Sequence, residues 1–170
     1  MSISFQHDIL PLKNELYRLA LRITLSREEA EDVVQETMIK VWNNRDRWQE
    51  IDSIEAYCLT ICRNLSLDAL RKKDNQHEVI DEENMQSAMF YTQNMQESII
   101  RQDRIQLIRQ LVNALPEKQR SCMQLRDFEG KTYKEIAAVL AISEEQVKVN
   151  IFRARQTVRQ RFQDIEKAES

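Results

Sequence analysis

Apolar side chains recur at three- and four-residue steps along most of this chain, which is the spacing of helices that bury one face. The first stripe predicts one helix, and its members are Ile9, Leu12, Leu16, Leu19 and Ile23. After it, Ser26 and the acidic residues that follow favour the start of a second helix. A serine oxygen caps free backbone N–H groups, and carboxylates in the first turn complement the helix dipole.

Two further stripes complete the first half of the chain. The second ends at Trp42, which we expect to pack in the core, and also contains Ala30, Val33, Val34, Met38 and Val41. The third leads into the basic residues 71–73 and contains Ile54, Cys58, Ile61, Cys62, Leu65 and Ala69. Together the three stripes predict a helical domain over residues 5–73.

The composition indicates an all-α fold. The chain of 170 residues has one glycine and two prolines, and 42% of its residues are hydrophobic. Tight turns between strands need glycine, proline or asparagine-glycine pairs, so their scarcity argues against a sheet. The hydrophobic share is sufficient for buried cores. We therefore expect two small helical domains.

Helical periodicity returns in the second half of the chain at Ile99 and continues through Val112. Pro116 suits the first turn of another helix, and Gly130 suits its left-handed C-terminal cap. These signals predict a second domain over residues 98–166. Between the two domains, residues 74–97 have weak periodicity and many acidic residues, so we expect a flexible linker that is either a spacer or a shield for a basic surface.

Residues 132–162 carry the most specific local pattern. Thr132 with Glu135, and Ser143 with Gln146, have the spacing of the capping box that starts a helix. Two capped helices with so short a connection predict a helix-turn-helix. At 100° per residue, one narrow arc of the second helix should be buried, and it contains Val147, Ile151, Ala154 and Val158.

The opposite face of this second helix carries the DNA-binding candidates. A recognition helix presents its N-terminal outer residues to base edges and later basic residues to phosphates. The base-proximal candidates are Lys148, Val149, Phe152 and Arg153. Arg155 and Arg159 suit phosphates, and Lys134 on the preceding helix is a further candidate. The alternative is a solvated basic helix with Phe152 tucked against a neighbour.

Charge is segregated along the chain. The formal net charge is only -3, but residues 28–36 are acidic without a base and residues 148–161 are basic without an acid. A basic stripe of this kind is typical of a nucleic-acid interface. An acidic helix face is unsuited to DNA and suits a basic protein partner.

Three segments together resemble the bacterial sigma factors of the extracytoplasmic-function (ECF) group. They are AEDVVQETMIKVW (30–42), AYCLTICRNLSLDALRKK (56–73) and LPEKQRSCMQLRDFEGKTYKEIAAVLAISEEQVKVNIFRARQTVRQRF (115–162). The resemblance implies a subunit that binds core RNA polymerase and directs it to promoter DNA. Its first domain would open the minus-ten element, and its second would read the minus-thirty-five element.

The resemblance also implies roles for single residues. The helix that docks on the polymerase is matched by Asp32, Gln35, Glu36 and Lys40. The part that captures unstacked promoter bases is matched by Trp48, Arg63, Asn64 and Arg71, and aromatic and basic residues are what such capture needs. For Trp48, packing in the core is an equal alternative. An anti-sigma factor is an implied partner.

Other classes of function find little support. Three cysteines and two histidines, without close spacing, predict neither a disulfide framework nor a metal site. The chain has no glycine-rich phosphate loop, and we expect no cofactor and no enzyme. The N-terminus lacks the features of a signal peptide, and no apolar run has membrane-spanning length, so we expect a cytoplasmic protein without membrane insertion. The alternatives are a stand-alone helix-turn-helix regulator and an adaptor with a basic helix.

Overall fold

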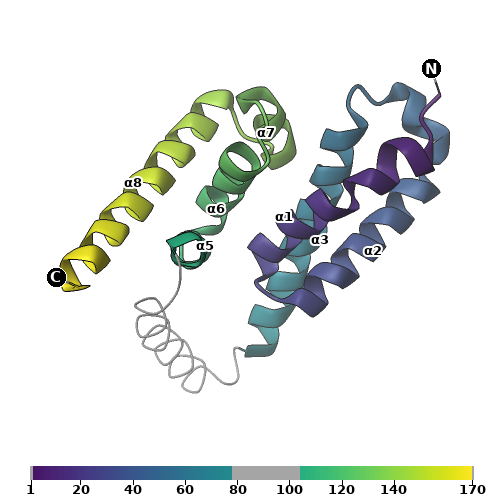
Figure 1. The fold of residues 1–170 in the computed structure, drawn as a ribbon. Helices are drawn as coiled ribbons and strands as arrows, with labels where there is room; N and C mark the ends of the chain where they lie inside the picture. The colour runs from purple at the N-terminus through teal and green to yellow at the C-terminus, as the bar shows by residue number, and fades with distance from the viewer. Residues whose placement is uncertain (1, 78–103, 170) are drawn as a thin grey trace.

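The computed structural model describes residues 2–77 and 104–169, and every regular element within them is helical (Figure 1). The first half contains η1 (Phe5–Ile9), η2 (Leu10–Leu12), α1 (Lys13–Thr24), α2 (Arg27–Asn43), η3 (Arg45–Glu50) and α3 (Ile54–His77). The second half contains α5 (Arg104–Asn113), α6 (Glu117–Met123), η4 (Gln124–Phe128), α7 (Tyr133–Leu140) and α8 (Glu144–Glu169). The all-α prediction is confirmed. Of the expected linker, residues 78–97 lie outside the described residues.

The first apolar stripe does not form one continuous helix. Two short helical turns, η1 and η2, precede α1, and Pro11 lies at the start of η2. Proline has no N–H to donate and its ring blocks a regular α-helical bond, so the α-helix begins only after it. The predicted cap of the next helix is present, because the Ser26 hydroxyl accepts a 3.3 Å bond from the Glu29 amide.

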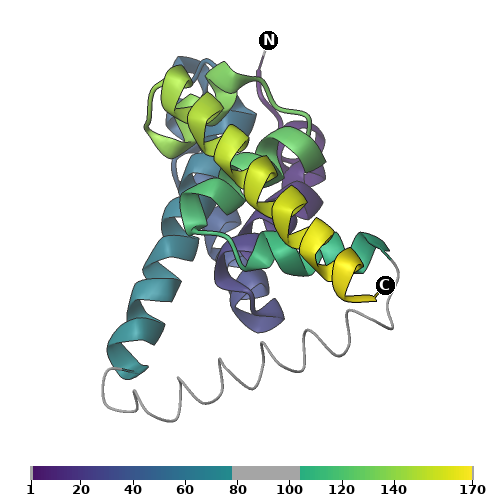
Figure 2. The same cartoon turned by 90° about the vertical axis from the view of Figure 1, so that its left-hand side faces the viewer.

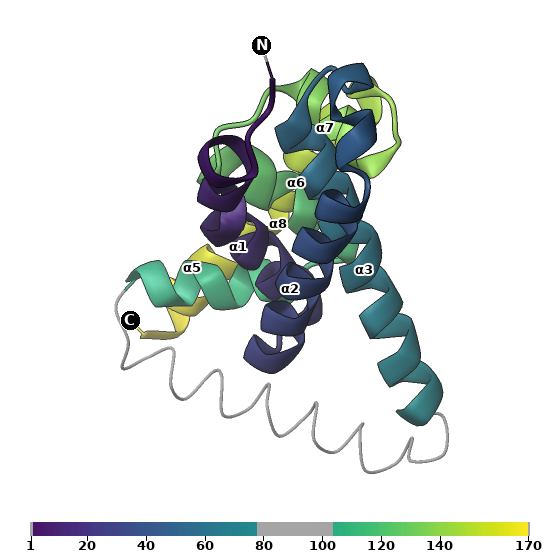
Figure 3. The same cartoon turned by 90° about the vertical axis from the view of Figure 1, so that its right-hand side faces the viewer.

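Helices α1, α2 and α3 pack against one another around a buried core (Figure 3). Its largest fully buried members include Leu16, Leu19, Ile23, Val41 and Leu59. The second half has its own smaller core between α5, α6 and α8, formed by Leu107, Leu111, Val112, Leu115, Met123, Ala154 and Val158.

The two halves also share a core. Helix α3 packs against α7, and α1 packs against α6, so the second half lies directly on the first (Figures 1 and 2). Cys122, Leu125, Ile136 and Val139 of the second half belong to the same buried cluster as the core of α1–α3. We call this contact region between the halves the seam. Helices α2 and α8 lie on opposite sides of the molecule (Figure 1).

The connection from η4 to α7 depends on a left-handed residue at Gly130, as predicted. Gly130 has φ of 70°, and its amide donates to the carbonyl of Arg126 at 3.2 Å. The next amide, of Lys131, donates to the carbonyl of Leu125 at 2.8 Å. These two hydrogen bonds end η4 and direct the following residues toward the seam.

We predict that Gly130→Ala lowers the free energy of unfolding by about 1 kcal/mol, because a residue with a Cβ is strained at positive φ. Steric crowding is not the cause, since a Cβ placed there meets no atom within 4 Å. Gly130→Asn should lower the free energy of unfolding by less, because asparagine tolerates the left-handed conformation. Urea unfolding of the three proteins measures the difference. Equal losses for alanine and asparagine would contradict the explanation.

Candidate nucleic-acid and protein interfaces

Both helices of the helix-turn-helix begin with the capping hydrogen bonds that the sequence pattern predicts. The Ser143 hydroxyl accepts from the Gln146 amide at 3.1 Å, and the Gln146 side chain accepts from the Ser143 amide at 3.0 Å. Thr132 caps α7 by accepting from the Glu135 amide at 3.1 Å. Ala141, with φ of 56°, ends α7 in the left-handed conformation. The predicted buried arc of α8 is confirmed.

The outer face of α8 presents the base-proximal candidates to solvent. Phe152 is 67% exposed and Val149 is 45% exposed, so Phe152 is not tucked against a neighbour. Lys148 and Arg153 are exposed on the same helix. This face is a basic surface with apolar side chains in it, and apolar contact with thymine methyl groups is one way that such a surface reads DNA.

A groove runs along this face, and it includes Tyr133, a residue that the sequence pattern does not single out. Its lining residues are Tyr133, Lys148, Ile151, Phe152, Arg155, Gln156 and Arg159. Tyr133 begins α7, and its ring lies 5.5 Å from the Lys148 ammonium and 4.4 Å from the Arg126 guanidinium. Cations over an aromatic face are attracted to it. The ring therefore helps to hold Lys148 in place.

The candidates for phosphate contact differ in whether a carboxylate of the protein already binds them. Arg159 and Lys134 are exposed. Arg155 instead forms a two-bond ion pair with Asp127 of η4, in which its Nε lies 3.1 Å from a carboxylate oxygen. A phosphate that binds Arg155 must therefore compete with this carboxylate or share the guanidinium with it.

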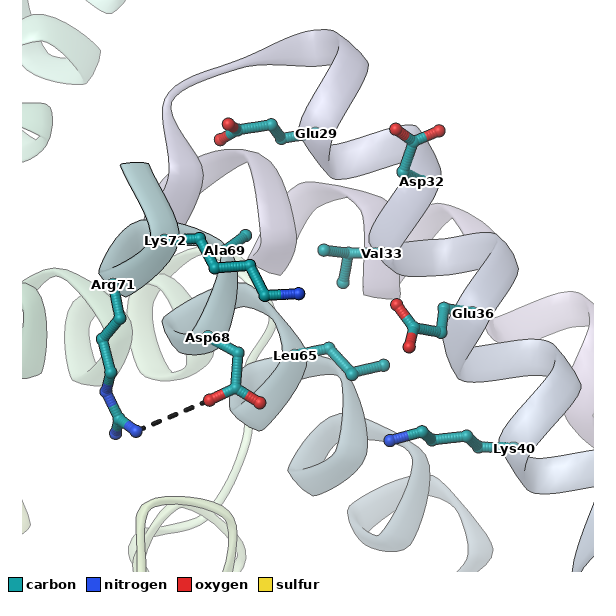
Figure 4. A pocket seen from close by; sticks show the side chains of 10 residues that line it. All are labelled: Glu29, Asp32, Val33, Glu36, Lys40, Leu65, Asp68, Ala69, Arg71 and Lys72. Atoms are coloured by element: carbon teal, nitrogen blue, oxygen red, sulfur yellow. Dashed lines mark ion pairs between the residues drawn. The ribbon is translucent and has the colours of Figure 1, made fainter. Parts of the chain in front are cut away.

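Three of the four polymerase candidates on α2 line a groove between α2 and α3 (Figure 4). Asp32, Glu36 and Lys40 lie on its α2 side. The α3 side contributes residues that sequence reasoning did not select, including Leu65, Asp68 and Lys72. In Figure 4, Glu36 and Lys40 extend from α2 toward α3, and Lys72 extends back toward α2. The groove carries both signs of charge over an apolar floor.

Two candidates lie elsewhere than the sequence pattern suggested. Gln35 faces a different groove, between α1 and α2, beside Tyr17 and Glu31. Arg71 lines the α2–α3 groove together with the polymerase candidates and pairs with Asp68 at 3.5 Å. Asn64 is exposed on α3. A step of one residue rotates a side chain by 100°, which separates Gln35 from Glu36.

Of the two tryptophans, Trp48 and not Trp42 packs in the core. Trp42 is 46% exposed, so its predicted packing in the core is wrong, whereas Trp48 is only 6% exposed. The short η3 turn folds Trp48 back, and its indole N–H donates to the Val41 carbonyl at 2.9 Å. Val41 takes the core position on α2, which turns Trp42 outward against Phe5 and Arg45.

Arg63 is also enclosed, although it was a candidate for capturing promoter bases. Its side chain is 8% exposed and pairs with Glu117 of α6 at 3.0 Å across the seam. Glu117 in turn accepts a 2.7 Å bond from the Ser121 hydroxyl. In this arrangement neither Trp48 nor Arg63 presents its polar group to solvent.

The residues that the structure describes contain neither a cluster of metal ligands nor a membrane-spanning helix. No group of three or more histidine, cysteine, aspartate or glutamate side chains is placed to hold a metal ion there. Within the same residues, no helix is both long and apolar enough to cross a membrane. Cys58, Cys62 and Cys122 are buried as free thiols.

Known proteins match this arrangement along both halves of the chain. Sigma-70 region 2 matches residues 9–76, and the region 4 family matches residues 105–158. The ECF RNA polymerase sigma factor SigW of Bacillus subtilis is 27% identical, over 93% of this chain and 89% of its own length. ECF sigma factor SigE of Mycolicibacterium smegmatis is 30% identical, over 86% of this chain and 56% of its own length.

A solved structure has the same fold. The sigma factor RpoE from Bartonella quintana, in complex with the anti-sigma factor NepR, superimposes with a TM-score of 0.72. It is 20% identical, and the match covers 98% of each chain.

A helical domain followed by a helix-turn-helix domain, each matching its own sigma-70 region, defines a transcription initiation factor. The chain belongs to the sigma-70 family and is an ECF sigma factor, which directs core RNA polymerase to specific promoters. A stand-alone helix-turn-helix regulator or an adaptor would leave the match over residues 9–76 without explanation.

We predict that the three thiols resist modification in the folded protein at pH 8. Burial raises the pKa of Cys58 and of Cys62 to about 12, and that of Cys122 to about 11. The reactive thiolate is therefore scarce at pH 8, whereas an unfolded cysteine has a pKa of about 8.5. A chromogenic disulfide reagent should react slowly with the native chain and fully in guanidinium chloride. Rapid reaction of the native chain would contradict the burial.

Proposed function

We propose that this sigma factor docks on core RNA polymerase through the α2–α3 groove and reads the upstream promoter element with the first turns of α8. The observation that carries the proposal is the separation of the two surfaces, which lie on opposite sides of the molecule (Figure 1). The two surfaces therefore do not overlap, and neither covers the other.

The polymerase contact would use Asp32, Glu36 and Lys40, with Gln35 at the neighbouring groove. An interface with both signs of charge favours a protein partner with a complementary charge pattern. Because like charges brought together are costly, such a pattern allows only one relative position of the two surfaces. Val33 and Leu65 at the base of the groove are already buried, at 4% and 8% exposed, so the contact would depend mainly on the charged side chains along its rim.

Promoter contact would involve both domains. Lys148, Val149, Phe152 and Arg153 would meet base edges of the minus-thirty-five element, and Lys134, Arg155 and Arg159 would meet phosphates. The first domain, over residues 5–73, would open the minus-ten element with Asn64 and Arg71. Trp48 and Arg63 take part only if their surroundings rearrange, since both are enclosed. Residues 74–97 would connect this domain to the second, over residues 98–166.

Three further features complete the proposal. The protein acts by binding and not by catalysis, it works in the cytoplasm where polymerase is, and an anti-sigma factor restrains it. The structural similarity to a sigma factor bound to the anti-sigma factor NepR supports the last point.

Charge reversal in the groove tests the docking surface. We expect Asp32→Lys combined with Glu36→Lys to weaken binding to purified core polymerase by about tenfold or more, because like charges oppose at the interface. Glu28→Lys, on the same helix but outside the groove, is the control. Fluorescence titration of labelled protein measures affinity, and circular dichroism checks folding. Unchanged affinity of the double variant would remove the groove from the docking surface.

Truncation on α8 tests the reading face. We expect Lys148→Ala and Arg153→Ala each to cost about 1–3 kcal/mol of promoter discrimination, while affinity for core polymerase is kept. Transcription from total genomic DNA, with start sites mapped by sequencing, reports which promoters are used. Arg161→Ala removes the same charge further along α8 and is the control. Unchanged start sites and yields for both variants would place the reading face elsewhere.

A further inference from the structure

The seam between the two domains is held by charged side chains as well as by the shared core. Lys131 lies between two carboxylates of the first domain, 2.8 Å from Glu15 of α1 and hydrogen-bonded to Glu55 of α3. Arg18 of α1 forms a two-bond ion pair with Glu129, one bond of which is 2.8 Å long. One lysine thus connects two helices of the first domain to the turn that starts the helix-turn-helix.

Lys131 is enclosed, which makes it dependent on these partners. Its side chain is 15% exposed, and that of Glu15 is 12% exposed. A charge removed from water is tolerated when it is paired, and removing its partner leaves a costly unpaired charge. Reversing the charge of Lys131 would place three carboxylates together in this enclosed space, so the closed seam cannot tolerate that change.

The same seam covers a residue that the first domain would use. Glu117 of α6 holds Arg63 at 3.0 Å, and the Arg63 side chain is 8% exposed. Glu117 belongs to the second domain, so Arg63 becomes accessible only when α6 moves away from α3. Closure of the seam and access to Arg63 therefore exclude each other.

The closed molecule is also too short to reach from the minus-ten element of a promoter to its minus-thirty-five element. Elements centred ten and thirty-five base pairs upstream lie about 25 base pairs apart, which is about 85 Å along the helix at 3.4 Å per base pair. A compact chain of this length is only about 40 Å across. One closed molecule cannot contact both elements, so the domains must separate when the promoter is bound.

We propose that the seam is an autoinhibitory latch: Lys131, gripped by Glu15 and Glu55, keeps the second domain closed over Arg63 until polymerase separates the domains. The functional consequence rests on the proposed function, but the latch itself is a property of the free chain. Its charged contacts make closure specific to one arrangement of the two domains, and their loss opens the molecule without unfolding either domain.

Small-angle X-ray scattering of the free, full-length chain tests the latch. We expect Lys131→Glu to have a larger radius of gyration than the parent, with unchanged helix content by circular dichroism. Lys118→Glu makes the same charge change at an exposed position of α6 and should scatter like the parent. The combination of Lys131→Glu with Glu55→Lys restores an opposite-charge contact and should return the radius toward the parental value.

Each outcome bears on the latch. An unchanged radius for Lys131→Glu overturns it, and so does expansion in Lys118→Glu or a failure of the swapped pair to restore compactness. If Lys131→Glu loses helix content, Lys131→Gln takes its place, and the parental radius in that variant would equally overturn the latch. The measurement needs neither polymerase nor DNA, so its failure leaves the proposed function standing.

Discussion

The structure depends on α3, which packs against other helices on two sides. Toward α1 and α2 it contributes Cys58 and Cys62, and the Cys62 thiol donates to the Leu16 carbonyl at 3.3 Å. Toward the second domain it contributes Glu55 and Arg63, which pair with Lys131 and Glu117. Because one rigid helix carries both sets, the three-helix core fixes the direction in which the helix-turn-helix domain can dock.

What the sequence predicted well depends on interactions between near neighbours. The cap formed by Ser143 and Gln146 involves residues three apart, and the buried arc of α8 follows from 100° per residue alone. The tryptophans show the limit of this reasoning. An apolar stripe identifies a face but not which aromatic residue fills the core, and Trp48 reaches it only because η3 folds back onto Val41. The pairing of Arg63 with a residue 54 positions away leaves no local pattern.

The acidic run on α2 illustrates how a sequence pattern divides in three dimensions. Residues 28–36 form one block of charge along the chain, yet the helix directs Asp32 and Glu36 to the groove with α3 and Glu31 to the groove with α1. The groove with α3 also contains Lys40, a basic residue that lies beyond the acidic run in the sequence. A partner therefore meets a mixed surface, and mixed surfaces discriminate between partners better than a uniform charge does.

A latch made of enclosed charges suits a protein that must both close and open. Well-packed apolar residues would often hold such a seam as firmly or more firmly, because paired charges pay a desolvation cost. While they are paired, the charges of Lys131, Glu15 and Glu55 mainly make closure specific to one arrangement, and a change that leaves one of them unpaired or reversed strongly opposes closure. Moving a molecule from 99% closed to 99% open requires about 5.5 kcal/mol of differential binding, whereas nanomolar docking supplies about 12 kcal/mol. A partner that binds with nanomolar affinity can therefore open a seam of this strength with part of its binding energy.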